Sequence, residues 1–143
     1  MAAKPRAVVD TNIFVSGLIS PHGPPAKILQ RLWEHRFILV TSPPINEEII
    51  AVLNRPWLRD RYGLEDKVFD IAFILWEWAE VVTNPPEIQI SKDPSDDKFL
   101  AAAIAGRADY LITGDSGHLL NLHEYNNIQI LSPRKFISIF NFQ

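Results

Sequence analysis

The chain has 143 residues, of which 47% are hydrophobic and 22% charged, and its formal net charge is −3. These values are typical of one globular domain, taken here as residues 1–143, and the net charge does not point to a nucleic-acid partner. The absence of cysteine excludes disulfide bonds and thiolate metal sites, so a metal would need oxygen or imidazole ligands.

Targeting and membrane signals are missing from the sequence. The first residues, "MAAKPRAVVD", hold no apolar stretch of the kind that a signal peptide requires. No apolar run reaches the roughly 20 residues that a membrane-spanning helix needs. We therefore expect a cytoplasmic protein without a membrane span.

Strand and helix patterns alternate along the chain. In chain order, the periodicity predicts a strand at residues 6–9, a helix at 25–35, a strand at 37–41, a helix at 42–54, a helix at 65–79, a strand at 81–83, a helix at 96–106, a strand at 110–113, a strand at 128–131 and a helix from 133 onward. Ser42 is expected to cap the second helix, with Pro43 and Pro44 in its first turn.

This alternation predicts βαβ units. The expected fold class is α/β: a three-layer α/β/α sandwich with a central, mainly parallel, Rossmann-like sheet of about five strands. The strands are continuously apolar, as expected for strands covered on both faces. In open sheets of this kind, sites form beyond the carboxyl ends of the strands.

Acidic residues fall at that end of the predicted sheet. Asp10 and Asp115 each follow a strand, while Glu48 lies at the edge of an apolar helical stripe. Asp96 and Asp97 open the helix at 96–106, and helical periodicity does not choose between them. Each acid alone has an ordinary explanation as a turn, cap or solvated residue. Gathered at one place, they would repel one another unless a cation or a shared proton offset their charge.

Four stretches carry a family resemblance: "VVDTNIFVSGL", "SPPINEEIIAVL", "DPSDDKFLAAAIAGRADYLITGD" and "IQILSPRKFI". In this order, over nearly the whole chain, they resemble PIN-domain nucleases, particularly the prokaryotic VapC-like toxins. The family's four acids match Asp10, Glu48, Asp97 and Asp115, with Asp96 as the neighbour of the third. The polar companions of the family's site match Thr11, Asn12 and Thr113.

The resemblance implies a metal-dependent endoribonuclease, the toxin component of a toxin–antitoxin system. RNA is then the substrate, a cognate antitoxin is a partner, and Mg²⁺ or Mn²⁺ is the cofactor, since both ions prefer oxygen ligands. Asp10 and Asp115 are expected to be the principal ligands, with Asp97 binding directly or through water. Glu48 is expected to bind a second ion or to orient the attacking water.

Other features have alternative interpretations. The apolar helix with Trp76 and Trp78 is expected to contribute to a homodimer interface. His118 could touch the scissile region and Lys98 could bind the RNA backbone, but both are more simply explained as surface residues. The alternative function is a catalytically weak PIN-fold RNA-binding or assembly module. A phosphatase is disfavoured by Asn12, where a second acid is usual, and a dinucleotide-binding protein by the lack of a G-x-G-x-x-G motif.

Overall fold

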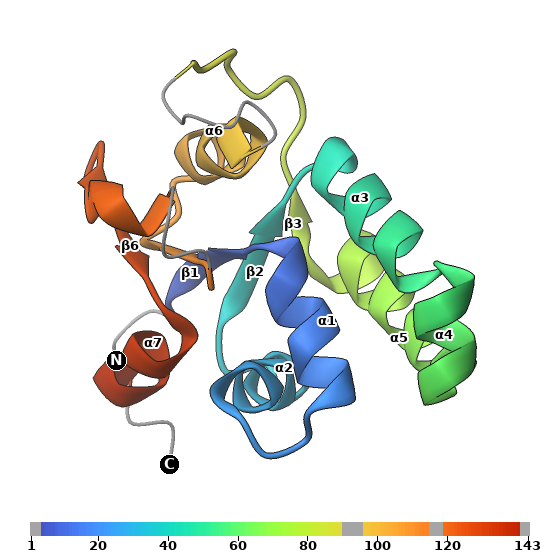
Figure 1. The fold of residues 1–143 in the computed structure, drawn as a ribbon. Helices are drawn as coiled ribbons and strands as arrows, with labels where there is room; N and C mark the ends of the chain where they lie inside the picture. Colours follow the sequence, from blue (N-terminus) through green and yellow to red (C-terminus); the bar gives the residue numbers. More distant parts are fainter. Residues whose placement is uncertain (1–3, 90–95, 115–118, 141–143) are drawn as a thin grey trace.

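A central sheet organises the chain in the computed structural model, which describes residues 4–89, 96–114 and 119–140 (Figure 1). Within these residues, the sheet has six strands in the order β3-β2-β1-β4-β6-β5. Their bounds are β1 Arg6–Val9, β2 Ile38–Thr41, β3 Glu80–Val81, β4 Tyr110–Ile112, β5 Glu124–Tyr125 and β6 Ile128–Leu131. All pairings are parallel except that between β5 and β6.

Helices cover both faces of this sheet. Figure 1 shows α6 on one side, α1, α2 and α7 on the other, and α3, α4 and α5 stacked beyond the β2–β3 edge. Their bounds are α1 Thr11–Ile19, α2 Pro24–Trp33, α3 Pro43–Leu53, α4 Pro56–Tyr62, α5 Glu65–Phe73, α6 Asp97–Ala105 and α7 Pro133–Phe140. A π-helical turn, η1 (Ile74–Trp78), continues α5, and a 3₁₀ turn, η3 (Leu119–Leu122), precedes β5.

The predicted α/β class with a mainly parallel sheet is therefore confirmed. Four elements of the described residues were not predicted: α1, α4, the 3₁₀ turn η3 and the short antiparallel strand β5. The predicted helix at 65–79 is present, but its last turn is wound as the π-helix η1. Ser42 occupies the N-cap position of α3, yet its side chain makes no capping hydrogen bond, so that detail of the prediction was wrong. No helix in the described part of the chain is long and apolar enough to cross a membrane.

Strand β1 lies at the centre of the sheet and determines where chemistry can occur. It pairs in parallel with β2 on one side and with β4 on the other, so the carboxyl ends of all three strands meet at one edge. Ala7, Val8 and Val9 are fully buried between the helical layers. The buried core therefore fixes the positions of the residues that directly follow these strands.

Helix α6 packs closely on the sheet, and this packing determines its position at the same edge. Helix α6 ends at Gly106, where a Cβ atom would lie only 2.3 Å from Val40 Cγ1 of β2. Glycine is thus the residue that allows this approach. The approach holds the C-terminal end of α6 against β2.

Candidate active site

Asp10 stands at the junction of β1 and α1 and is almost completely buried. Its backbone N–H donates to the Ile112 carbonyl of β4 at 3.1 Å, which extends the pairing of the two strands. Its carboxylate Oδ1 accepts from the Ile13 N–H at 3.3 Å and so caps the first turn of α1. Asp10 therefore both starts a helix and presents a carboxylate at the sheet edge.

Burial raises the pKa of Asp10 from 3.8 to about 6. Hydrogen bonds from the Thr113 side chain and from the Ile13 and Asn12 backbone lower the pKa, and the charge of Asp96 raises it. The removal of water therefore outweighs the hydrogen bonds that favour the charged form. A cation beside this carboxylate would offset the cost of its charge.

Thr113 follows β4 directly and is fully buried. Its hydroxyl donates a hydrogen bond to Asp10 Oδ2. Because β1 and β4 are neighbours in register, residues 103 positions apart in sequence meet here. Thr113 thus orients the second carboxylate oxygen of Asp10.

Glu48 reaches the same edge from α3. The Thr11 hydroxyl, next to Asp10 in the chain, donates to Glu48 Oε2, and the Lys98 ammonium of α6 lies 2.7 Å from Glu48 Oε1. The side chain of Glu48 is 33% exposed and that of Lys98 is 21% exposed. Three helices, α1, α3 and α6, therefore meet at one half-buried carboxylate.

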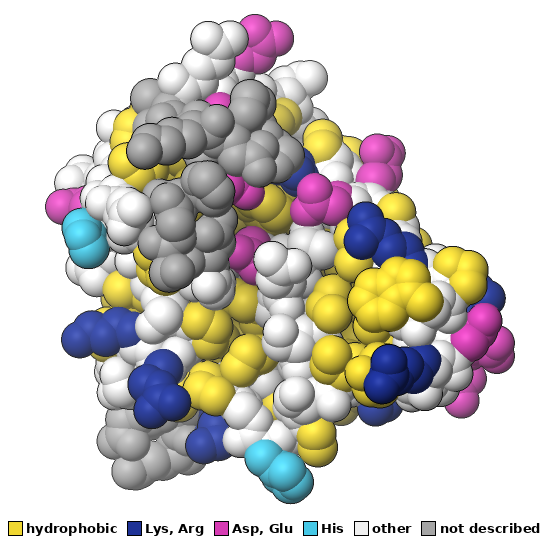
Figure 2. All heavy atoms as spheres, in the orientation of Figure 1, with side chains coloured by type: hydrophobic (Ala, Val, Ile, Leu, Met, Phe, Trp, Pro, Cys, Tyr) yellow, Lys and Arg dark blue, Asp and Glu magenta, His cyan; other side chains and the backbone are white. Residues whose placement is uncertain are grey.

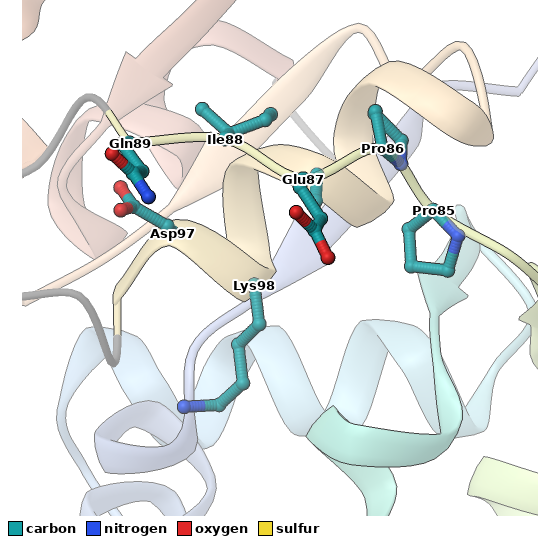
Figure 3. Close-up of a pocket in the computed structure, with 8 residues that line it drawn as sticks. Pro85, Pro86, Glu87, Ile88, Gln89, Asp97 and Lys98 are labelled. Carbon is teal, nitrogen blue, oxygen red and sulfur yellow. The ribbon is translucent and has the colours of Figure 1, made fainter.

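The two acids that open α6 differ in their surroundings. Asp97 is buried as the first residue of the helix, whereas Asp96 precedes it and is half-buried. Figure 3 shows the Asp97 carboxylate beside the side chain of Gln89, pointing away from the Lys98 ammonium. Asp96, in contrast, is the acid whose charge acts on Asp10. The structure thus gives each of the two acids one feature expected of a site residue.

An open cavity of about 680 Å³ adjoins this edge (Figure 3). Its walls are formed by the extended segment 85–89 and by three residues of α6: Asp97, Lys98 and Ala101. In Figure 2, acidic side chains gather near the middle of the face that α1, α3 and α6 border. Of the candidate site acids that the structure describes, Asp97 lines this cavity, whereas Asp10 and Glu48 do not.

The predicted site residues are thus partly brought together. Asp10, Glu48, Thr11 and Thr113 lie in one connected region, and Asn12 contributes its backbone while its side chain is exposed. Asp115 and His118 lie outside the described residues. Among the residues that the structure describes, no three acids or histidines form a metal-binding group. Convergence of all four acids on one point stays a prediction.

Lys98 is the residue of this region that the sequence suggested to be an ordinary surface residue. Its position next to Asp97 was the available signal, because the second residue of a helix lies about 100° around the axis from the first. An acidic and a basic side chain at such neighbouring helix positions leave the helix in different directions and can contact different parts of one site. Only the packing of α3 against α6 shows which carboxylate the lysine reaches.

Comparison with known proteins adds a family and a fold. A family model described as PIN domain matches residues 6–117. An uncharacterized protein of Methanocaldococcus jannaschii, MJ1680, is 33% identical over 145 residues, which cover 96% of this chain and 92% of that protein.

Solved structures of VapC proteins share the arrangement of the chain. VapBC2 from Rickettsia felis, bound to a DNA fragment from its promoter, superposes with a TM-score of 0.54 at 14% identity, covering 89% of this chain and 98% of the other. VapC20 of Mycobacterium tuberculosis, described as a sarcin–ricin loop cleaving toxin, gives a TM-score of 0.52 at 16% identity, covering 86% and 98%. At these identities the likeness establishes the fold.

Proposed function

Because the chain belongs to the PIN domain family and has the fold of VapC proteins, we propose that it is a Mg²⁺- or Mn²⁺-dependent endoribonuclease and the toxin of a toxin–antitoxin pair. The observation that carries the proposal is the buried carboxylate of Asp10 at the carboxyl end of the central strand, oriented by Thr113 and adjacent to Glu48 through Thr11. A solvated turn aspartate would need neither burial nor a dedicated hydroxyl donor.

Asp10, Asp97 and Asp115 are the proposed ligands, with Glu48 as the fourth acid and Asp96 as a neighbour. This donor set contains only oxygen, which suits Mg²⁺ and Mn²⁺ rather than softer metals. The raised pKa of Asp10 supports the same conclusion, since a buried carboxylate without a cation is costly to ionise. The residues present therefore fit a hard divalent ion.

A bound ion of this kind supplies positive charge to the phosphate and lowers the pKa of water for in-line attack on phosphorus. The chain itself fixes the geometry. Thr113 and the Ile13 N–H hold the Asp10 carboxylate at both oxygens, which limits its rotation. Glu48 is held by Thr11 on one oxygen, so it can accept a proton or orient a water from a fixed position.

RNA is the proposed substrate and an antitoxin the proposed partner. The cavity lined by segment 85–89, Asp97 and Lys98 offers a place for a nucleotide next to Asp97. VapC20, which shares the fold, is described as cleaving an RNA loop, and VapBC2 as bound to promoter DNA. These likenesses favour single-stranded or loop RNA over duplex substrates.

We also propose a homodimer that uses the surface of α5 and η1. Phe69, Phe73 and Trp76 are respectively 74%, 47% and 48% exposed, although all three are large and apolar. Figure 2 shows hydrophobic side chains gathered over α4 and α5 on one face. Exposed aromatic groups of this kind usually mark protein contacts, and a two-fold pair is the commonest arrangement.

The test is cleavage of a labelled RNA pool by purified protein in Mn²⁺ and in EDTA, with Asp10→Asn and Asp115→Asn variants in parallel. Loss of the ion should remove several kcal/mol of transition-state stabilisation, which corresponds to at least about a 100-fold lower rate. Glu47→Gln is a matched control, because Glu47 is an exposed acid next to Glu48 in the chain.

Two results would contradict the proposal. Cleavage that persists in EDTA and in both variants would indicate a contaminant or a metal-free mechanism. Absence of cleavage by wild-type protein freed of any co-purified partner would favour the alternative of an RNA-binding or assembly module.

A further inference from the structure

The Lys98–Glu48 ion pair is an unusual feature to find at a proposed metal site. Its Nζ–Oε1 distance is 2.7 Å, and both side chains are mostly removed from solvent. The other oxygen of Glu48 accepts from the Thr11 hydroxyl. Both carboxylate oxygens of Glu48 are therefore engaged by groups of the chain itself.

An ion pair that served only to tie α3 to α6 would not need this location. Exposed ion pairs between helices contribute little to stability. Here the pair lies at the carboxyl end of the sheet, and its third member, Thr11, directly follows Asp10. Glu48 is thereby connected to the proposed ligand Asp10 through one residue of the backbone.

The direction of Lys98 supports a role within the site. Figure 3 shows its side chain leaving α6 on the side opposite to the Asp97 carboxylate and extending toward the segment that holds β1 and α1. Its ammonium also lies 5.0 Å from the centroid of the Phe99 ring, so the charge has an aromatic neighbour as well as an acid. Its stem lines the cavity where we place the RNA.

A divalent ion at Glu48 would compete with this ammonium. Two cations at contact distance from the same carboxylate oxygen repel strongly in a half-buried region, where screening by water is weak. Asp10 differs in this respect, because among the residues that the structure describes its hydrogen-bond partners are a hydroxyl and backbone N–H groups, none of which carries a positive charge. A metal ion therefore meets a charged competitor at Glu48 but not at Asp10.

We infer that Lys98 supplies the second positive charge of the site, so that the protein binds one divalent ion at Asp10 and its neighbours while Glu48 holds the lysine ammonium in place of a second ion. This inference rests on the proposed function and narrows the role of Glu48 within it. Lys98 then donates hydrogen bonds to a nonbridging phosphate oxygen of RNA, as lysine commonly does in phosphate sites.

The primary experiment counts Mn²⁺ ions without RNA, by titrating the purified chain and measuring free Mn²⁺ by electron paramagnetic resonance at neutral pH. Wild-type protein should bind one Mn²⁺ per chain with high affinity. Glu48→Gln should leave that affinity unchanged within about threefold, whereas Asp10→Asn should weaken it at least about tenfold. Lys98→Met should expose Glu48 to a second Mn²⁺ of lower affinity.

Two further variants make the result specific to the charge at position 98. Lys98→Arg keeps a cation and should bind one Mn²⁺ as the wild type does. Lys67→Met removes an exposed lysine of α5 and is the matched control, which should change neither the number of ions nor their affinity. Urea unfolding of every variant checks that the fold is retained.

Two tight Mn²⁺ ions in the wild type, or a tenfold loss of affinity in Glu48→Gln, would overturn the inference while leaving a metal-dependent nuclease intact. A single ion in Lys98→Met would overturn it as well. Failure of the wild type to bind any Mn²⁺ would instead overturn the proposed function, and this inference with it.

Discussion

The hydroxyl of Thr113 donates to the carboxylate of Asp10, although the two residues are 103 positions apart in the chain. Both are buried, and each follows a strand of the same parallel pair. The hydrogen bond favours the charged form of Asp10 and lowers its pKa. Removing this hydrogen bond should therefore lower the free energy of unfolding most at pH values where Asp10 is ionised.

Thr113→Val keeps the shape of the side chain but removes the donor. We expect the free energy of unfolding of the metal-free protein to fall by about 1.5–3 kcal/mol above pH 6, the range for hydrogen bonds to charged groups. At pH 4, where Asp10 is protonated, the loss should be smaller. Urea unfolding in EDTA at both pH values measures the difference, and Thr113→Ser, which retains the hydroxyl, is the control. An equal loss at both pH values would contradict a bond to the charged form.

Asp10 should make the metal-free protein less stable as the pH rises. Its pKa is raised from 3.8 in the unfolded chain to about 6 in the folded one, so the folded state binds the proton more tightly between these values. Stability attributable to Asp10 is therefore greatest below pH 4 and falls until about pH 6. At about 1.4 kcal/mol per pKa unit, the total is of the order of 3 kcal/mol.

Asp10→Asn isolates this effect, because asparagine mimics the protonated acid and also caps helices well. In EDTA, the variant should be more stable than the wild type at pH 7, and the difference should shrink toward pH 4. Saturating Mn²⁺ should reverse the order at pH 7 by stabilising only the wild type. A pH-independent difference would argue against burial as the source of the raised pKa.

The two acids at the start of α6 can be separated by substitution. Asp97→Asn should lower both Mn²⁺ affinity and RNA cleavage at least about tenfold, as expected for the loss of a metal ligand. Asp96→Asn should change both by less than about threefold and should lower the pKa of Asp10 slightly, because its charge raises that pKa. The reverse order of the two effects would identify Asp96 as the ligand.

Self-association should depend on Phe69, the most exposed large apolar residue among those described. Phe69→Glu should convert a dimer into a monomer at micromolar concentration, as measured by light scattering, and the free energy of unfolding should fall only by the contribution of the dimer contact. Asp66→Asn, an exposed change one turn earlier in α5, serves as the control. A monomeric wild type would exclude the proposed homodimer.

Hydrophobic periodicity predicted the helices and strands that have one apolar and one polar face. It did not predict elements whose sequence lacks such a regular alternation of apolar and polar residues. Residues 11–19 mix apolar residues with Thr11, Asn12, Ser16 and Gly17 in an order that shows little helical period, so α1 is not apparent in the sequence. Helix α4 was not predicted, because Pro56 interrupts the helical pattern after residue 54, although proline is well tolerated at the first position of a helix.

Strand β5 was missed because its hairpin is made by a turn rather than by a long strand. Asn126 and Asn127 both adopt left-handed backbone angles, with φ values of 49° and 66°, which asparagine tolerates better than most residues. The pair was a usable signal. The strand itself has only two residues, too few for any alternation to be recognised.

In the candidate site, the residues at strand ends and at the edge of an apolar helical stripe could be predicted from the sequence. The contacts between helices and strands could not. The sequence placed Asp10 after a strand and Glu48 beside an apolar stripe, and both are there. The partner of Lys98 depends on how closely α6 packs against the sheet and α3, which involves residues such as Gly106 far from the acids. No local pattern encodes that distance.

The strand order also determines when the surroundings of Asp10 can form during synthesis of the chain. During synthesis from the N-terminus, β1 and β2 can pair early, but β4 is made only after residue 109, and it completes the surroundings of Asp10. Until β4 joins, Asp10 lacks the Thr113 hydroxyl and the neighbouring strand. If the chain is the proposed ribonuclease, a ribosome-bound fragment ending before β4 should therefore lack RNA cleavage, and activity should arise only after most of the chain has been translated.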